Sequence, residues 1–113
     1  MRPGDVVLIR LPQTRGGPLK LRPALILSWL PGPYQNLLIC GISTQMQQVE
    51  RDWDELIQPS DPDFAQTGLR LASVARLSYL YAADRTEISG TIGQIDPARL
   101  DRLLLRLARH LHR

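Results

Sequence analysis

The stretch LRPALILS, residues 21–28, decides how the chain folds. The residues that follow Pro23 form a short apolar run, which is typical of a buried strand. Pro23 stands near the start of this strand, where a missing N–H group is best tolerated. Arg22 therefore puts a permanent charge at the mouth of an apolar strand. It either closes a loop at the surface or supplies the cation of a binding site from a rigid element.

Further strands are predicted on both sides of this one. Residues 6–11 follow the turn Pro3-Gly4-Asp5, and residues 37–42 follow a proline- and glycine-rich turn and are apolar enough to form a central strand. Beyond residue 45, the pattern predicts a short strand containing Trp53, Leu56 and Ile57, one helical turn over 63–67, and strands over 69–77 and 86–95 with bends or bulges at Gly90 and Gly93.

The C-terminal segment predicts an amphipathic helix. Asp96 is the candidate N-cap, and Pro97 fits the first helical position. One face carries Leu100, Leu103, Leu104, Leu107 and Leu111, and the opposite face carries Arg102, Arg106, Arg109 and Arg113. We expect the arginine face to be solvated, because cations suit the C-terminal end of a helix dipole. A phosphate-binding stripe is the functional alternative.

These elements predict one domain over residues 1–113, of the mainly-β with α class. Five or six short strands joined by tight turns and followed by one helix indicate a small β-barrel capped by that helix. No apolar run approaches the roughly 18–20 residues of a membrane span. Asp5 and Arg10 interrupt the apolar N-terminus, which favours a first strand over a signal peptide, so we expect a cytoplasmic protein.

Composition limits the chemistry. The net charge of +3 divides into +4 over residues 1–45, −4 over 46–95 and +3 over 96–113, and the basic first part is compatible with a phosphate ligand. The single cysteine, Cys40, lies among apolar residues and is expected to be a small buried hydrophobe rather than a nucleophile. The two histidines lie at the C-terminal end, and no metal site is predicted.

The chain lacks a glycine-rich phosphate loop, paired metal ligands and a GxSxG motif. What remains is Arg22 and the run Ser43-Thr44-Gln45, where the central strand ends. A guanidinium offers a planar fork of donors suited to phosphate, and phosphoryl transfer requires charge stabilisation above all. Arg22 is unsuited to act as a base because a guanidinium stays protonated at physiological pH. No side chain is assigned as the general base.

An ordered set of blocks carries a family resemblance. They are GDVVLIRLP (4–12), LRPALILS (21–28), ISTQ (42–45), GLRLASVARL (68–77) and IGQID (92–96), the last followed by the leucine-rich helix. This set resembles the MazF/PemK family of toxin ribonucleases over nearly the whole chain. The resemblance implies an SH3-like small β-barrel, a homodimer, and a toxin of a type II toxin–antitoxin system. The activity implied is that of an mRNA interferase, a metal-independent endoribonuclease without a cofactor.

The resemblance further implies that single-stranded RNA lies in a groove across the dimer interface and is cut at short sequences. The 2′-hydroxyl attacks the adjacent phosphate and leaves a 2′,3′-cyclic phosphate, and a cognate antitoxin inserts a peptide into the same groove. The catalytic residues implied are Arg22, Ser43 and Thr44. The RNA-binding residues expected are Gln13, Thr14, Arg15, Lys20, Gln45 and Arg76, with residues 13–20 acting as a lid. Arg76 is also open to pairing with an acid such as Asp84.

Two departures from the family pattern leave a second function open. Some members carry an acid where this chain has Gly17, and some carry a histidine where it has Leu21. A catalytically inactive RNA- or protein-binding module on the same barrel is therefore the alternative. A structural interaction protein that exposes its arginine helix to an acidic partner is a third reading. Trp29 and Tyr34 are candidates for stacking RNA bases or for packing.

Overall fold

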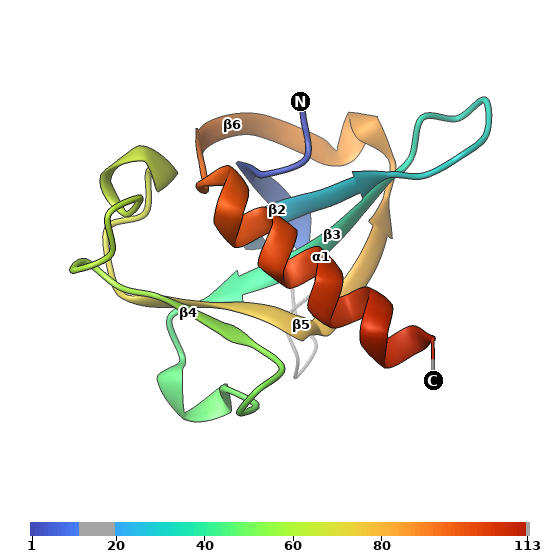
Figure 1. Cartoon of the computed structure of the whole chain (residues 1–113). Coiled ribbons are helices and arrows are strands. Elements are labelled where there is room, and N and C mark those ends of the chain that lie inside the picture. Colours follow the sequence, from blue (N-terminus) through green and yellow to red (C-terminus); the bar gives the residue numbers. More distant parts are fainter. Residues whose placement is uncertain (12–19, 113) are drawn as a thin grey trace.

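A computed structural model describes residues 1–11 and 20–112 and shows one helix lying across a curved antiparallel sheet (Figure 1). The strands are β1 (Asp5–Leu11), β2 (Lys20–Trp29), β3 (Leu37–Ser43), β4 (Glu55–Ile57), β5 (Ser73–Ala83) and β6 (Ile88–Gln94). The helix is α1 (Pro97–Leu111), and the 3-10 turns are η1 (Met46–Gln48), η2 (Ala65–Thr67) and η3 (Arg85–Glu87).

The six strands form one sheet in the order β4-β5-β3-β2-β1-β6, and every neighbouring pair is antiparallel. The predicted mainly-β with α class is confirmed. The sheet is not closed into a barrel within the described residues, because β4 and β6 form its two edges. It nevertheless curls strongly, since Ala83 of β5 and Ile88 of β6 contribute to the same apolar cluster.

Two apolar clusters lie on the two faces of the sheet. The larger cluster lies under α1 and contains Leu25 and Leu27 of β2 together with Leu103 and Leu107 of the helix. The smaller one, on the other face, contains Ala24 and Ile26. Consecutive residues of β2 thus alternate between two cores, which explains why the strand is apolar throughout. Each fully buried leucine or isoleucine contributes about 1.5–3 kcal/mol relative to exposure.

The predicted strands are found, with two shifts in position. The short strand β4 begins at Glu55, so the predicted member Trp53 lies in the turn before it. β5 begins at Ser73 rather than at Leu69, and it continues through Tyr79 and Tyr81, which partly cover the smaller cluster. The bulges expected near Gly90 and Gly93 are present as two register shifts in the pairing of β6 with β1. Such bulges increase the local twist of a strand and so support the curl of this edge.

The helix begins as predicted. The Asp96 side chain accepts a hydrogen bond from the Ala98 N–H, and Pro97 occupies the first turn. The leucine face is buried at Leu103 and Leu107, but Leu111 is 73% exposed. Leu111 shares the leucine face but is the last residue of the helix, whose C-terminal end extends past the sheet (Figure 1). In the described part of the chain, no helix has both the length and the hydrophobicity of a membrane span.

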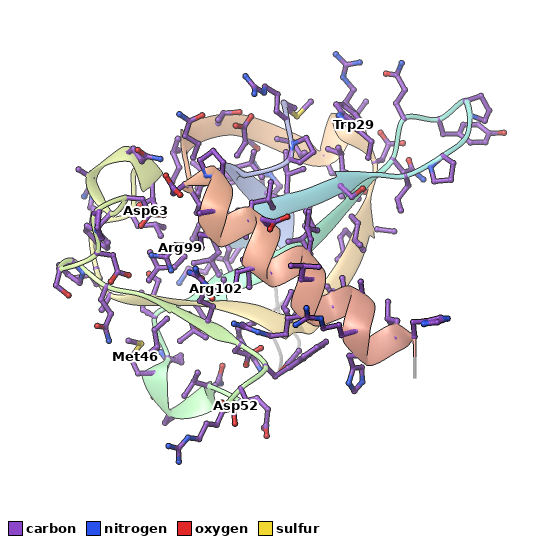
Figure 2. All side chains as sticks on the ribbon, in the orientation of Figure 1. Trp29, Met46, Asp52, Asp63, Arg99 and Arg102 are labelled. Carbon is purple, nitrogen blue, oxygen red and sulfur yellow. The ribbon has the colours of Figure 1, made fainter. Side chains whose placement is uncertain are left out.

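The arginine face of α1 is not simply solvated, which corrects the sequence-based expectation. Arg102 and Arg106 both pair with Glu55 of β4, at 2.9 Å and 3.2 Å. Arg99, which the leucine pattern did not single out, is buried, and Figure 2 shows it extending from the helix toward the segment that carries Asp63. The face packs against acidic residues of the sheet edge and of the following loop.

All five N–H donors of Arg99 are satisfied. The Nε group donates to Asp63 at 2.9 Å, and one terminal nitrogen donates to Asp61 and Asp63, both at 2.8 Å. The other donates to Glu55 at 3.0 Å and to the Leu56 carbonyl at 2.8 Å. A buried charge is tolerated only when it is paired and hydrogen-bonded in this way.

Glu55, Asp61, Asp63 and Arg99 together form an ion cluster. Its three carboxylates are held in their ionised form. The hydrogen bond from Arg99 lowers the pKa of Asp63, and that of Asp61 is lowered by the Gln58 N–H and then by Arg99. Burial acts to raise the pKa of Glu55, but the hydrogen bond from Arg102 and the charges of the nearby arginines outweigh it, and the pKa is lowered. The pKa of Arg99 is raised by its hydrogen bond with Asp63.

The turn after η2 packs tightly against β6. Gly68 has a φ of +76°, and a Cβ added there would lie 2.2 Å from the Ile92 carbonyl oxygen. A Cβ on Gly93 would lie 2.3 Å from the Gln66 carbonyl oxygen. Only glycines permit this backbone contact, which fixes the chain just before β5.

Replacing Arg99 with methionine should lower the free energy of unfolding by about 3–5 kcal/mol at pH 7, because three carboxylates lose a buried partner. The folded-state pKa values are lowered, so the stabilisation is complete above the ordinary value of 4.5 for Glu55 and is lost as pH falls through the lower values. Urea unfolding of both proteins should therefore show a difference that shrinks below about pH 4. Arg109→Met, an exposed change on the same helix, is the matched control, and equal loss in both variants would contradict the assignment.

Replacing Gly68 with alanine should destabilise the fold by about 1–3 kcal/mol, since the added Cβ meets the Ile92 carbonyl and the backbone needs a positive φ. Gly90→Ala is the control, because nothing lies within 4 Å of a Cβ built there. We expect the control to change the stability by less than about 0.5 kcal/mol. Urea midpoints measure both, and a neutral Gly68→Ala would show that the contact relaxes freely.

Candidate nucleic-acid interface

A groove of about 440 Å³ lies where β2 begins and β3 ends. Its walls come from five parts of the chain: β1, the start of β2, the end of β3, the segment before β5, and β6. The lining residues are Leu8, Lys20, Leu21, Arg22, Pro23, Ile42, Ser43, Thr44, Gly68, Leu69, Arg70, Leu71, Ser73 and Ile92. The three residues predicted to be catalytic, Arg22, Ser43 and Thr44, therefore line the same groove.

Strand register explains why Arg22 and Ser43 meet. The ladder between β2 and β3 ends at the pair Ala24–Gly41. Two residues further along each strand, on the same face of the sheet, come Arg22 and Ser43. Pro23 has no N–H to donate, which suits the end of the ladder at this point. Arg22 stays in the sheet because it still pairs with Ile9 of β1.

The hydroxyl groups are suited to donate hydrogen bonds into the groove. The Ser43 oxygen accepts a hydrogen bond from the Gln45 N–H at 3.0 Å, which orients the side chain and leaves its proton to donate. Thr44 is exposed and makes no side-chain hydrogen bond within residues 1–11 and 20–112. Both groups can therefore donate to an anionic oxygen without breaking a contact within this part of the chain.

The charge of the groove has one sign. Lys20, Arg22 and Arg70 line it, and none of the lining residues that the structure describes is acidic. None of the three cations forms an ion pair with a described carboxylate. Unpaired cations in a concave, partly apolar surface concentrate a positive potential there. The groove is thus suited to a polyanion whose charges are spaced along a chain.

Other predicted RNA-binding residues lie elsewhere or outside the described part of the chain. Gln45 is exposed and accepts a hydrogen bond from Gln47, but it does not line the groove. The structure does not describe residues 12–19. The predicted RNA-binding residues Gln13, Thr14 and Arg15 therefore lie outside the described part of the chain, as does the predicted lid over 13–20 except for Lys20.

Arg76 lies on the same face of the sheet as Arg22 but two strands away, since Gly41 of β3 pairs with both Ala24 and Arg76. It does not line the groove. Its Nη1 donates to Gln48 at 3.2 Å, and its Nε lies 3.9 Å from the Asp54 carboxylate and has no hydrogen-bond partner among the described residues. Arg76 therefore pairs with an acid, as one of the two alternatives expected, but that acid is Asp54 and not Asp84.

Asp84, at the end of β5, and Asp54, near Arg76, have different structural roles. Asp84 caps η3 by accepting from the Thr86 N–H and Oγ1. Asp54 has a fully buried carboxylate that accepts from the Ser78 N–H and hydroxyl, both at 3.0 Å. Sequence reasoning missed Asp54 because its partner on β5 lies 24 residues away.

The aromatic candidates lie away from the groove. Trp29, labelled in Figure 2, is 41% exposed at the end of β2. It lines a separate hollow with Met1 and Arg85. Tyr34 is 79% exposed in the following turn, so it does not pack in the core. Arg70 is the groove residue that sequence reasoning missed, although it stands in the quoted block GLRLASVARL. Among the described residues, no group of three His, Cys, Asp or Glu side chains is arranged to hold a metal ion.

Residues 2–111 match the family described as PemK-like, MazF-like toxin of type II toxin-antitoxin system. The chain belongs to this family. The resemblance predicted from the sequence is therefore confirmed, and the match spans every described strand and the helix. A search among curated proteins found no match. PemK/MazF-like toxins are generally endoribonucleases, and a type II toxin implies an antitoxin partner.

In this PemK/MazF-like toxin, Cys40 should behave as a core residue. It is completely buried in the larger cluster, and burial, aided by the charge of Asp54, raises the pKa of its thiol to about 12. A disulfide reagent at pH 8 should therefore leave the folded toxin unmodified and react with one thiol per chain in urea. Rapid labelling without denaturant would contradict this assignment.

Proposed function

We propose that the chain is the endoribonuclease toxin of a type II toxin–antitoxin pair and cleaves single-stranded mRNA at short sequences without a metal ion. The observation that carries this proposal is the groove that joins three unpaired cations to the hydroxyls of Ser43 and Thr44. The family match supports the same class of activity.

In the proposed reaction, the RNA 2′-oxygen attacks the adjacent phosphorus and loses its proton to solvent water. The new O2′–P bond forms as the P–O5′ bond breaks, and the departing 5′-oxygen gains a proton. The products are a 2′,3′-cyclic phosphate and a 5′-hydroxyl end. Negative charge builds on the non-bridging oxygens during this step, so fixed hydrogen-bond donors at those oxygens accelerate it most.

Arg22 takes the central role in this scheme. Its guanidinium donates to the non-bridging oxygens and is proposed to give a proton to the leaving oxygen and to regain one from solvent. Ser43 and Thr44 donate from the end of β3, which lies beside β2. Lys20 binds phosphate as a point charge at the rim of the groove. The general base is left unassigned among the side chains.

We further propose that the toxin works as a homodimer in the cytoplasm and that the antitoxin occupies the same groove. The dimer extends the groove across two copies, as the resemblance to the family implies. This chain has Gly17 where some family members carry an acid and Leu21 where some carry a histidine. Catalysis in this proposal therefore depends on Arg22 and the hydroxyls of Ser43 and Thr44.

Replacing Arg22 with alanine should reduce the cleavage rate by at least about 10²–10³-fold, the scale for removing one preorganised donor. Ser43→Ala should cost less, because Thr44 still donates. The assay incubates pure, EDTA-treated protein with RNA of mixed sequence and identifies cyclic-phosphate ends on the products. Arg109→Ala, which alters an exposed residue of α1 outside the groove, serves as the matched control.

The outcomes separate the proposal from its alternative. Wild-type cleavage that persists in Arg22→Ala would refute the assignment of Arg22. RNA binding by the wild type without a cut at any sequence would favour the catalytically inactive binding module.

A further inference from the structure

We propose that Arg70 binds a phosphate next to the scissile one and thereby sets the position of the RNA along the groove. This inference rests on the proposed function. Arg70 lines the groove with Arg22, but from another part of the chain, the segment between η2 and β5.

The sheet pairing places Arg70 beyond the reacting groups. The ladder between β3 and β5 ends at the pair Ser43–Val74, and Arg70 precedes Val74 by four residues. Arg22 and Ser43 line the groove from the adjacent strands β2 and β3, whereas Arg70 lines it from the separate segment before β5. A chain of phosphates that enters the groove at Arg22 can therefore meet Arg70 at a neighbouring phosphate.

The segment that carries Arg70 is held on both sides. Before it, the buried Thr67 hydroxyl donates to the Phe64 carbonyl at 2.6 Å and accepts from the Leu69 N–H at 3.2 Å. After it, the Ser73 hydroxyl donates to the Leu71 carbonyl at 2.8 Å. The close contact of Gly68 with the Ile92 carbonyl adds a third restraint. A fixed backbone lowers the entropy cost of placing a cation on a ligand.

The side chain of Arg70 is not used by the fold. The preceding residue, Leu69, packs against the larger apolar cluster, whereas Arg70 is exposed. It makes no hydrogen bond or ion pair with any residue in 1–11 or 20–112. By contrast, Arg99 and Arg102 form ion pairs with carboxylates of the fold.

A contact with a non-reacting phosphate is made equally in the bound substrate and in the transition state. Its loss should therefore raise KM and leave kcat nearly unchanged, whereas loss of Arg22 lowers kcat. This split distinguishes a substrate-binding role of Arg70 from a catalytic one.

The test compares Arg70→Gln with wild type and with Arg109→Gln, a change of an exposed arginine outside the groove. With cleavable RNA, we expect Arg70→Gln to raise KM about tenfold, the scale for one charge-assisted hydrogen bond. With RNA blocked by a 2′-O-methyl group at the attacking nucleotide, the plot of log affinity against log salt should become shallower by about 0.7. The control should match the wild type in both assays.

A set of blocked RNAs, each with one phosphate neutralised as a methylphosphonate, locates the contact. Neutralising the phosphate bound by Arg70 should weaken the wild type but leave Arg70→Gln unaffected. If Arg70→Gln keeps the wild-type KM and salt dependence, the inference is overturned while the proposed nuclease stands. If the wild type neither binds nor cleaves RNA, both are overturned, and circular dichroism with urea unfolding shows that each variant is folded.

Discussion

The buried guanidinium of Arg99 is the interaction on which the position of the helix depends. A charged group removed from water is stable only where its donors are all satisfied, and Arg99 reaches this state with three carboxylates and one carbonyl. These partners come from β4 and the loop after it, so α1 can lie in few other orientations. Leu103, one turn further along the helix, is thereby aligned with the larger core.

The ion cluster around Arg99 is connected to the groove by the backbone that follows Asp63. Asp63 binds both Arg99 and the N–H of Asp96, and it directly precedes the turn that leads into η2. From η2 the backbone passes over Gly93 and Gly68 to Arg70, whose segment forms one wall of the groove. The opposite wall belongs to β2 and β3 and rests on their strand register. The groove thus has one wall fixed by the sheet and another fixed by ion pairs and glycine contacts.

Local pattern was enough to predict the strands and the Asp96 cap, because each depends on alternation or on near neighbours, whereas the family resemblance implied that Arg22 and Ser43 share a site. It failed where partners are far apart in sequence. Arg99 was overlooked since its carboxylates lie 36 to 44 residues away. Arg70 was missed for the same reason, because only the packing of Gly68 on β6 brings it to the groove. Leu111 followed the helical period but lies beyond the sheet, an end that periodicity does not mark.

The charge of the groove follows from where the acids are used. Residues 46–95 carry a net charge of −4 and residues 96–113 one of +3. Within these parts, Glu55, Asp61 and Asp63 are bound by arginines of α1, so their field is largely cancelled at short range. The net charge of +4 on residues 1–45 is not cancelled in this way. Two of its cations, Lys20 and Arg22, line the groove without described acidic partners. The helix arginines therefore support an anion site that they do not touch, because they keep the nearby carboxylates from competing for its cations.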